Sequence, residues 1–340
     1  MGEPGIAQLE PDKIWDLPAG CALRPLGRGY NNFLYRLHSS IGESLPFVLR
    51  VYGNHANPKY IQHEMSVLVQ LASRALPFAV PVPIPNRRGE LWALADYGLG
   101  ARLMVLVPFI RGENPDVHDL AQAEAAGQAM ATLHAALRQV ESRGVGAPRP
   151  YIELGRVHPL VPNPFEAMRQ FGSLATRSDV AHVDAILERI CAHEKRIRAL
   201  PQQLIHGDFI AGNILMEGTQ VSGVLDFENC AFNPRAMDFA IAIDTWCWDA
   251  MSSGREWERI AALARGYRRV GCFSEEEIAL LPAMMLLRNA SVLMHLVGRF
   301  LANLSPFVDV ENWVDSMKRV DAWLILHGHR LTACIREHMI

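Results

Sequence analysis

The chain has 340 residues, of which half are hydrophobic and a fifth are charged, a balance typical of globular proteins. Its 33 Lys and Arg against 36 Asp and Glu give a formal net charge of −3, which favours neither nucleic acid nor an anionic membrane as a partner. The composition also excludes collagen, coiled coil and intrinsic disorder. This length predicts about two domains with a core large enough to need no disulfide or metal.

The cysteines and the first residues bear on where the protein works. None of the six cysteines has the CxxC spacing of a redox or zinc site, so we expect scattered buried thiols in a reducing compartment. Residues 1–10 have neither the basic nor the apolar region of a secretory signal. The longest apolar run, residues 279–287, is too short to span a bilayer. These observations predict a cytoplasmic protein with no membrane partner.

The first third of the chain predicts short strands around one helix. Ile61, Leu68 and Leu71 lie near helical spacing, which indicates a helix over residues 59–74. The other apolar runs are rich in aromatic and β-branched residues and are bounded by turns, as strands are. These runs are residues 33–37, 46–52, 91–94 and 102–108. We therefore predict a small antiparallel sheet with one helix.

After Gly112 the pattern becomes helical. Apolar residues at helical spacing predict buried helices around residues 126–137 and 183–197. Ser274 and Glu277 form a capping-box signature ahead of a long apolar helix through Leu304. Strand-like runs interrupt this pattern at residues 204–205, 214–216 and 221–227. The pattern predicts an α+β protein with a small β-rich N-terminal lobe, residues 1–111, and a larger helical C-terminal lobe, residues 112–340.

The stretch from residue 204 to residue 215 carries the chemistry. Asp208 stands five residues before Asn213 between strand-like runs, and a second acid, Asp226, follows thirteen residues after Asn213. Phosphoryl transfer from ATP needs one carboxylate to accept a hydrogen bond, and then the proton, from the attacking hydroxyl. It also needs hard oxygen ligands, such as an amide and a second carboxylate, to hold Mg²⁺ against the phosphates. The three residues therefore predict a phosphotransferase that uses ATP and Mg²⁺.

The order of these motifs resembles one superfamily. His-Gly-Asp-x-x-x-x-Asn at 206–213, Asp-Phe-Glu at 226–228 and Asp-Phe-Ala at 238–240 are similar to the aminoglycoside phosphotransferase and choline kinase superfamily. The resemblance implies a bilobal protein-kinase-like fold. Residues 226–238 look like choline kinases, whereas residues 245–282 look more like type II homoserine kinases.

The resemblance also implies roles for individual residues. Asp208 is the expected catalytic base, Asn213 and Asp226 are the expected magnesium ligands, and His206 and Asp238 are expected to support the loop through hydrogen bonds. The small lobe is expected to bind the nucleotide. The residues implied are Gly27, Gly29, Asn32, Arg50, Glu64 and Val107.

The type of each of these residues suits the binding of a nucleotide. Gly27 and Gly29 let backbone N–H groups approach phosphates, and Asn32 replaces the third glycine of a kinase loop; an ordinary hairpin turn is the alternative. Arg50 stands where a lysine is typical, with Glu64 as its partner on the helix, and a purely structural arginine is the alternative. Backbone groups around Val107 are expected to bond the adenine edge.

The acceptor pocket is expected in the helical lobe. Trp246, Trp248 and Asp244 cluster in the sequence, and aromatic faces with carboxylates hold ammonium groups; core tryptophans with surface acids are the alternative. Arg288 would meet a substrate carboxylate, which favours homoserine over choline. Glu228 is expected to approach a second metal or the substrate, with a surface position as the alternative.

These features predict transfer of the ATP γ-phosphoryl group to the hydroxyl of a small molecule, homoserine first. Choline, ethanolamine, methylthioribose, a sugar or an aminoglycoside are alternative acceptors. A catalytically silent nucleotide-binding regulator is the alternative from another class, because Arg50 and the glycine loop depart from the kinase pattern. The sequence contains neither the GxxxxGK[ST] of P-loop proteins nor the GxSxG of many hydrolases. We expect a monomer or homodimer.

Overall fold

The computed structural model describes residues 9–28, 32–53, 58–96, 101–142, 146–174, 176–251 and 253–339. The chain forms two compact units. The first runs to Gly112 and also includes Val140–Ala147 and Ser222–Glu228. The second comprises Glu113–Gln139, Pro148–Val221 and the chain from Asn229 onward.

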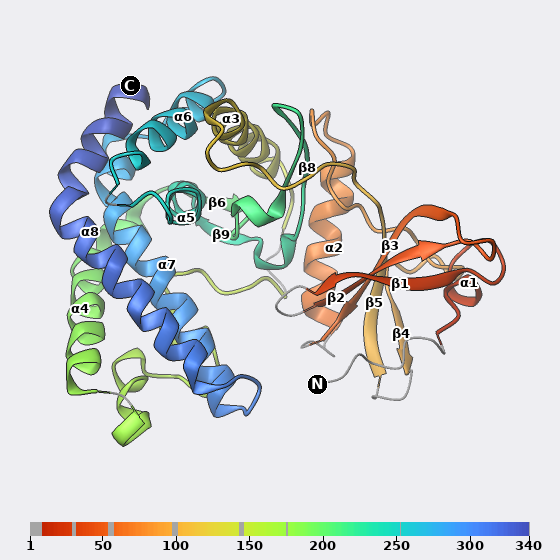
Figure 1. Cartoon of the computed structure of the whole chain (residues 1–340), viewed down its shortest axis with the longest axis horizontal. Helices are drawn as coiled ribbons and strands as arrows, with labels where there is room; N and C mark the ends of the chain where they lie inside the picture. Colours follow the sequence, from red (N-terminus) through yellow and green to blue (C-terminus); the bar gives the residue numbers. More distant parts are fainter. Residues whose placement is uncertain are drawn as a thin grey trace. The chain divides into compact units, whose positions relative to one another are not determined.

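The first unit is built on a five-stranded antiparallel sheet (Figure 1). In spatial order the strands are β1 (Ala22–Arg28), β2 (Asn32–His38), β3 (Ser44–Tyr52), β5 (Ala101–Pro108) and β4 (Ala93–Asp96). Helices α1 (Pro11–Ile14) and α2 (Pro58–Ala72) belong to the same unit. The expected antiparallel sheet and helix are confirmed. β1 was not among the strands that the sequence analysis delimited. It contains Pro25, a residue that sheets tolerate on edge strands such as this one.

Side chains of β3 point alternately to the hydrophobic core and to the face of the sheet that carries Arg50. Leu49 and Val51 belong to the hydrophobic core of the first unit, with the fully buried Trp15 and Met104. Because successive side chains in a strand point to opposite faces, Arg50 projects from the other face of the sheet. A central strand buried on both faces thus carries one cation.

The units are not continuous in sequence, unlike the expected division at residue 111. The N–H of Ala79 donates to Ser222 O at 2.9 Å, and the N–H of Val224 donates to Ala79 O at 3.0 Å. These bonds tie residues 222–228 to the first unit. The later segment brings Asp226 and Glu228 into that unit, which a sequence boundary alone does not indicate.

The second unit is mostly helical (Figure 1). Its helices are α3 (Leu120–Leu137), α4 (Arg177–Ala199), α5 (Ala236–Trp246), α6 (Glu256–Arg268), α7 (Glu275–Leu301) and α8 (Phe307–Met339). β6 (Gln202–Ile205) pairs antiparallel with β9 (Ala231–Pro234). The chain also forms β7 (Ile214–Glu217), β8 (Gln220–Val224), and the 3-10 turns η2 (Leu154–Arg156), η3 (Pro164–Glu166), η4 (Arg169–Leu174), η5 (Ala211–Asn213) and η6 (Phe227–Asn229).

Helix α7 is the central helix of the second unit. The capping box of Ser274 and Glu277 is present, and the helix continues through Pro282, ending three residues before the expected Leu304. It is long and apolar enough to cross a membrane, but 78 % of its most apolar window is buried within the protein, as in a core helix. α8, which packs beside it (Figure 1), was not expected, although its buried residues follow a helical period.

The cysteines differ in burial. Cys21, Cys230 and Cys247 are buried thiols, as expected. Cys191 and Cys272 are exposed, so the expectation of buried thiols was wrong for these two. Cys191 lies on the charged helix α4, where only one face is covered by protein, and its position falls on the other face.

Candidate active site

The loop that the sequence predicts to be catalytic, residues 206–213 (called the catalytic loop below), follows β6 in the second unit and turns at Gly207. This glycine has φ of +80°, and a Cβ built on it would lie 2.2 Å from the carbonyl oxygen of Asn229. A side chain at this position is therefore excluded by both backbone conformation and space. The glycine of His-Gly-Asp is what allows the chain to turn here and present Asp208.

Hydrogen bonds fix the backbone of the loop. The carboxylate of Asp238, in the first turn of α5, accepts the N–H groups of His206 and Gly207, each at 2.8 Å. The N–H of Asp208 in turn donates to Nδ1 of His206 at 3.2 Å. Asp238 and His206 are both completely buried. The backbone N–H groups of residues 206, 207 and 208 are thus all hydrogen-bonded.

Tyr151 adds a support that the sequence did not indicate. Its hydroxyl donates to the carbonyl oxygen of Gly207 at 2.5 Å, and its N–H donates to Oδ1 of Asn233 at 2.9 Å. Burial raises the pKa of Tyr151 well above its usual value, so the phenol remains a donor. A single tyrosine in an irregular segment gives no sequence signal of this contact.

The carboxylate of Asp208 has a partner on each oxygen. Nδ2 of Asn213, at the end of η5, donates to the Asp208 carbonyl at 2.9 Å and to Oδ2 at 3.2 Å. Nη2 of Arg288, in α7, donates to Oδ1 at 3.1 Å. Asp208 is therefore held in place through both of its carboxylate oxygens.

A buried acid lies near the same arginine. Asp244 in α5 is 7 % exposed, and its Oδ2 accepts from Nδ2 of Asn289 at 3.0 Å. Burial raises its pKa to about 6, although Arg288 and the bond from Asn289 oppose that rise. Among the described residues, Oδ1 of Asp244 and Nε of Arg288 are buried without a hydrogen-bond partner. The second unit therefore holds one unsatisfied carboxylate oxygen and one unsatisfied guanidinium nitrogen, and the same guanidinium bonds Asp208.

The two tryptophans lie differently from the expected ammonium cage. Trp246 is completely buried in the core. The ring of Trp248 carries the guanidinium of Arg319 over its face, 4.0 Å from the centroid. That face already holds a cation, in the place that an ammonium group would take, whereas Asp244 and Arg288 each keep an unbonded polar atom.

In the first unit, Arg50 gathers three carboxylates. Its Nη1 bonds Glu64 of α2 at 2.8 Å, and its Nη2 bonds Asp226 at 2.8 Å and Glu228 at 2.9 Å. Burial opposes the charge of Arg50, but the carboxylates hold its pKa well above the usual value. Burial in turn raises the pKa of Glu64 to about 7 against the effect of Arg50. The hydroxyl of Tyr52 completes the cluster by donating to Glu64 at 2.8 Å.

Asp226 and Glu228 leave β8 through an unusual conformation. Asp226 has φ of +63°, in the left-handed region that residues other than glycine rarely adopt. Glu228, two residues on, also accepts from Nδ2 of Asn32 at 2.9 Å. Asn32 begins β2, so this bond connects the glycine-loop region to the acidic segment. Gly27 lies at a register shift in β1, and Gly29 lies outside the described residues. Val107 lies in β5, opposite Val48.

Each unit offers one side-chain oxygen of the kind that binds a divalent metal. In the described parts of the chain, no group of three or more His, Cys, Asp and Glu is placed to hold a metal. Asn213 uses its amide nitrogen on Asp208, which leaves its carbonyl oxygen for a metal, and Asp226 offers a carboxylate that is 34 % exposed. Mg²⁺ takes few protein oxygens when phosphates and water complete its shell.

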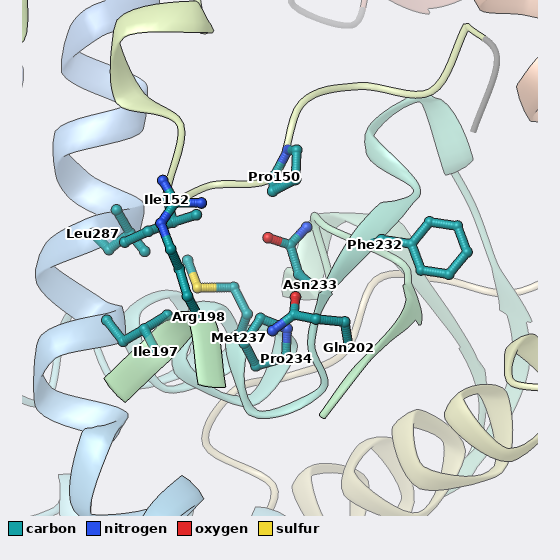
Figure 2. A pocket seen from close by; sticks show the side chains of 10 residues that line it. All are labelled: Pro150, Ile152, Ile197, Arg198, Gln202, Phe232, Asn233, Pro234, Met237 and Leu287. Atoms are coloured by element: carbon teal, nitrogen blue, oxygen red, sulfur yellow. The ribbon is translucent and has the colours of Figure 1, made fainter. Parts of the chain in front are cut away.

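A pocket of about 250 Å³ lies in the second unit (Figure 2). Its walls are mainly apolar, with Ile152 and Leu287 on one side, Phe232 on the other, Pro150 between them, and Arg198 among the lining side chains. Of the residues that the structure describes, none that the sequence implied for catalysis, metal or acceptor lines it. Asn233 lines the pocket and accepts a hydrogen bond from the N–H of Tyr151. The pocket therefore borders the segment that supports the catalytic loop.

Comparison with known proteins agrees with this geometry. The sequence model of the Phosphotransferase enzyme family matches residues 22–295. The homoserine kinase of Beijerinckia indica subsp. indica is 28 % identical over 270 residues, 79 % of this chain and 78 % of that one.

Solved structures share the fold. The structure of a microcompartment-associated aminopropanol kinase has a TM-score of 0.69 and 19 % identity, covering 94 % of this chain and 95 % of that one. The amicoumacin kinase in complex with AMP-PNP and Ca²⁺ has a TM-score of 0.65 and 16 % identity, covering 88 % of each chain. The expected α+β, protein-kinase-like fold is confirmed.

Proposed function

The chain belongs to the phosphotransferase enzyme family and is a small-molecule kinase, and we propose that its acceptor is an amino alcohol that also carries a carboxylate, best represented by homoserine. The observation that carries the proposal is the placement of Arg288 against Asp208, with the buried Asp244 near the same guanidinium. Homoserine combines a primary hydroxyl, an ammonium group and a carboxylate. Each charge has a complementary partner in this cluster.

The roles of the residues follow from their positions. Asp208 orients the acceptor hydroxyl and takes its proton, Arg288 binds the carboxylate, and Asp244 binds the ammonium group. The ionised form of Asp244, which the proposal requires, predominates above a pH of about 6. The relative from Beijerinckia, a homoserine kinase, supports the same acceptor.

We propose that the first unit binds the nucleotide. Arg50, held by Glu64, binds phosphate oxygens, and the residues around Gly27, Gly29, Asn32 and Val107 hold the rest of ATP. Asn213 and Asp226 each offer an oxygen to Mg²⁺. The bound metal would neutralise charge on the phosphates during transfer. Glu228 supports Arg50 and Asn32 through the hydrogen bonds that it accepts from both.

Two further proposals concern the protein as a whole. An ATP-dependent enzyme needs a supply of the nucleotide, which the cytoplasm provides, and we place the protein there. We also propose that the protein is a monomer, with a homodimer as the alternative.

A panel of acceptors with Mg·ATP tests the proposal. Homoserine, choline, ethanolamine, methylthioribose, sugars and aminoglycosides are compared by kcat/KM, and we expect homoserine to be the best. Turnover of aminoglycosides alone would refute the acceptor assignment. Binding of Mg·ATP without turnover of any acceptor would favour the silent regulator. Asp208→Ala should abolish transfer while ATP binding is retained.

A matched pair of acceptors isolates the role of Arg288. 3-Aminopropan-1-ol is homoserine without the carboxylate, so the ratio of the two kcat/KM values cancels general damage to catalysis. Arg288→Met should lower that ratio by about tenfold or more, the range for a hydrogen bond to a charged group. Arg299→Met, on the same helix, is the control and should leave the ratio unchanged. An unchanged ratio in Arg288→Met would contradict carboxylate binding by this residue.

A further inference from the structure

Buried polar groups from two other helices support Asp238 from behind. Nε2 of His134, in α3, lies 2.9 Å from Oδ2 of Asp238, and Nδ1 of His134 lies 3.0 Å from the hydroxyl of Tyr267, in α6. The three side chains are at most 3 % exposed. A polar chain buried this deeply needs all its members bonded, so their geometry is tightly constrained.

A close crossing of α3 and α6 brings His134 to Tyr267. A Cβ on Gly127, two turns before His134, would lie 2.0 Å from a backbone oxygen of α6. A Cβ on Gly266, which precedes Tyr267, would lie 1.8 Å from a backbone oxygen of α3. Side chains at either position would separate the two helices. The two glycines therefore set the spacing that the bond between His134 and Tyr267 requires.

The chemistry of the groups fixes donors and acceptors. A carboxylate oxygen only accepts, and Asp238 already accepts from His206 and Gly207, so Nε2 of His134 carries a proton. Burial raises the pKa of Tyr267 well above its usual value, so its hydroxyl stays protonated. With a neutral imidazole, Nδ1 of His134 is the acceptor for that hydroxyl hydrogen.

We propose that His134 and Tyr267 are positioning residues for phosphoryl transfer. Tyr267 donates to His134, His134 donates to Asp238, and Asp238 holds the backbone that presents Asp208. Without the imidazole, Asp238 is free to rotate away from the loop amides, and Asp208 shifts with the loop. A misplacement of about 1 Å at a catalytic group costs about a hundredfold in rate. Both residues are fully enclosed and touch no substrate, so binding is unaffected.

We call the hydrogen bonds from Tyr267 to His134 and from His134 to Asp238 the relay. Steady-state kinetics with Mg·ATP and homoserine test its role. His134→Leu removes the donor and should lower kcat by about thirtyfold, with both KM values within about twofold of wild type. The side-chain nitrogen of Gln reaches the place of Nε2, so His134→Gln should restore kcat to within about fivefold of wild type. Tyr267→Phe should lower kcat by about threefold to tenfold. Met130→Ala, one turn earlier in the core of α3, is the control: it lowers the melting temperature and leaves kcat unchanged.

The kinetic test rests on the proposed function, since it needs the acceptor. A second measurement does not need the acceptor. ¹⁵N NMR of histidine-labelled protein, assigned with His134→Gln, should show His134 as the neutral Nε2–H tautomer, with its Nδ1 resonance displaced in Tyr267→Phe. If His134→Leu does not fold, Tyr267→Phe and the spectrum decide the question.

Several results would overturn the relay. These are wild-type kcat in His134→Leu, a loss of kcat shared by Met130→Ala, no gain from His134→Gln, KM changes in place of kcat changes, or an Nδ1–H tautomer. If homoserine and every other acceptor are left unphosphorylated, the proposed function fails, and the spectrum still decides the relay.

Discussion

Replacing Asp244 by Asn is expected to stabilise the protein at neutral and alkaline pH. Burial raises the pKa of this carboxyl from 3.8 to about 6, and Arg288 only partly opposes that rise. The folded chain therefore holds the proton more tightly than the unfolded chain. Ionising Asp244 costs folding free energy, and the protein tolerates that cost at a site where we propose that the charge binds substrate.

The magnitude follows from linkage. The folded and unfolded pKa values differ by about two units, and each unit is worth about 1.4 kcal/mol, so the penalty is about 3 kcal/mol. Because the folded pKa is the higher one, the free energy of unfolding falls as pH rises from about 4 to about 6 and then levels off. Asn has no proton to lose. Asp244→Asn should therefore gain about 3 kcal/mol at pH 8 and almost nothing at pH 4.

Urea unfolding followed by tryptophan fluorescence measures this difference at both pH values. Asp249→Asn is the matched control, because a hydrogen bond from Arg259 holds the pKa of the half-exposed Asp249 below its usual range. The control should not stabilise the protein at pH 8. Our reasoning is refuted if Asp244→Asn gains no stability at pH 8, or gains the same amount at both pH values.

The same carboxylate should make the KM for homoserine rise as pH falls through about 6, since protonated Asp244 loses its attraction for ammonium; a pH profile that Asp244→Asn leaves unchanged would contradict this. Arg50→Lys should raise the KM for ATP by about tenfold, because one ammonium nitrogen cannot replace the two nitrogens that bond Glu64 and Asp226; an unchanged KM would show that the fork is dispensable. Gly266→Ala should lower the melting temperature by about 5 °C or more, because its Cβ meets the backbone of α3; calorimetry showing wild-type stability would exclude this close crossing.

Local chemistry explains what could be predicted from the sequence. Asp208, Asn213 and Asp226 occupy one short stretch of sequence. Phosphoryl transfer needs a base and metal ligands, so residues of these types at this spacing predict the reaction without a structure. The strand and helix periods likewise indicated the sheet around Arg50 and its neighbour Glu64, and the structure pairs these two side chains.

Contacts between distant segments had no such signal. Arg288 reaches Asp208 across 80 residues, and Tyr267 reaches His134 across 133. Helical periodicity tells which face of a helix is buried, but it does not tell which helix covers that face. For the same reason Trp248 was expected to bind ligand, although its face carries a neighbouring arginine.

The sequence by itself therefore determined the reaction class and predicted which residues form the catalytic loop, since these depend on residue type and short spacing. Only the tertiary structure decided how the loop is held by its neighbours and how the pKa of Asp244 is set. Burial is a property of the packed chain, and it sets the pKa of Asp244 and the bonds of Asp238. The choice of acceptor depends on such groups, because it is made where several helices bring their side chains together.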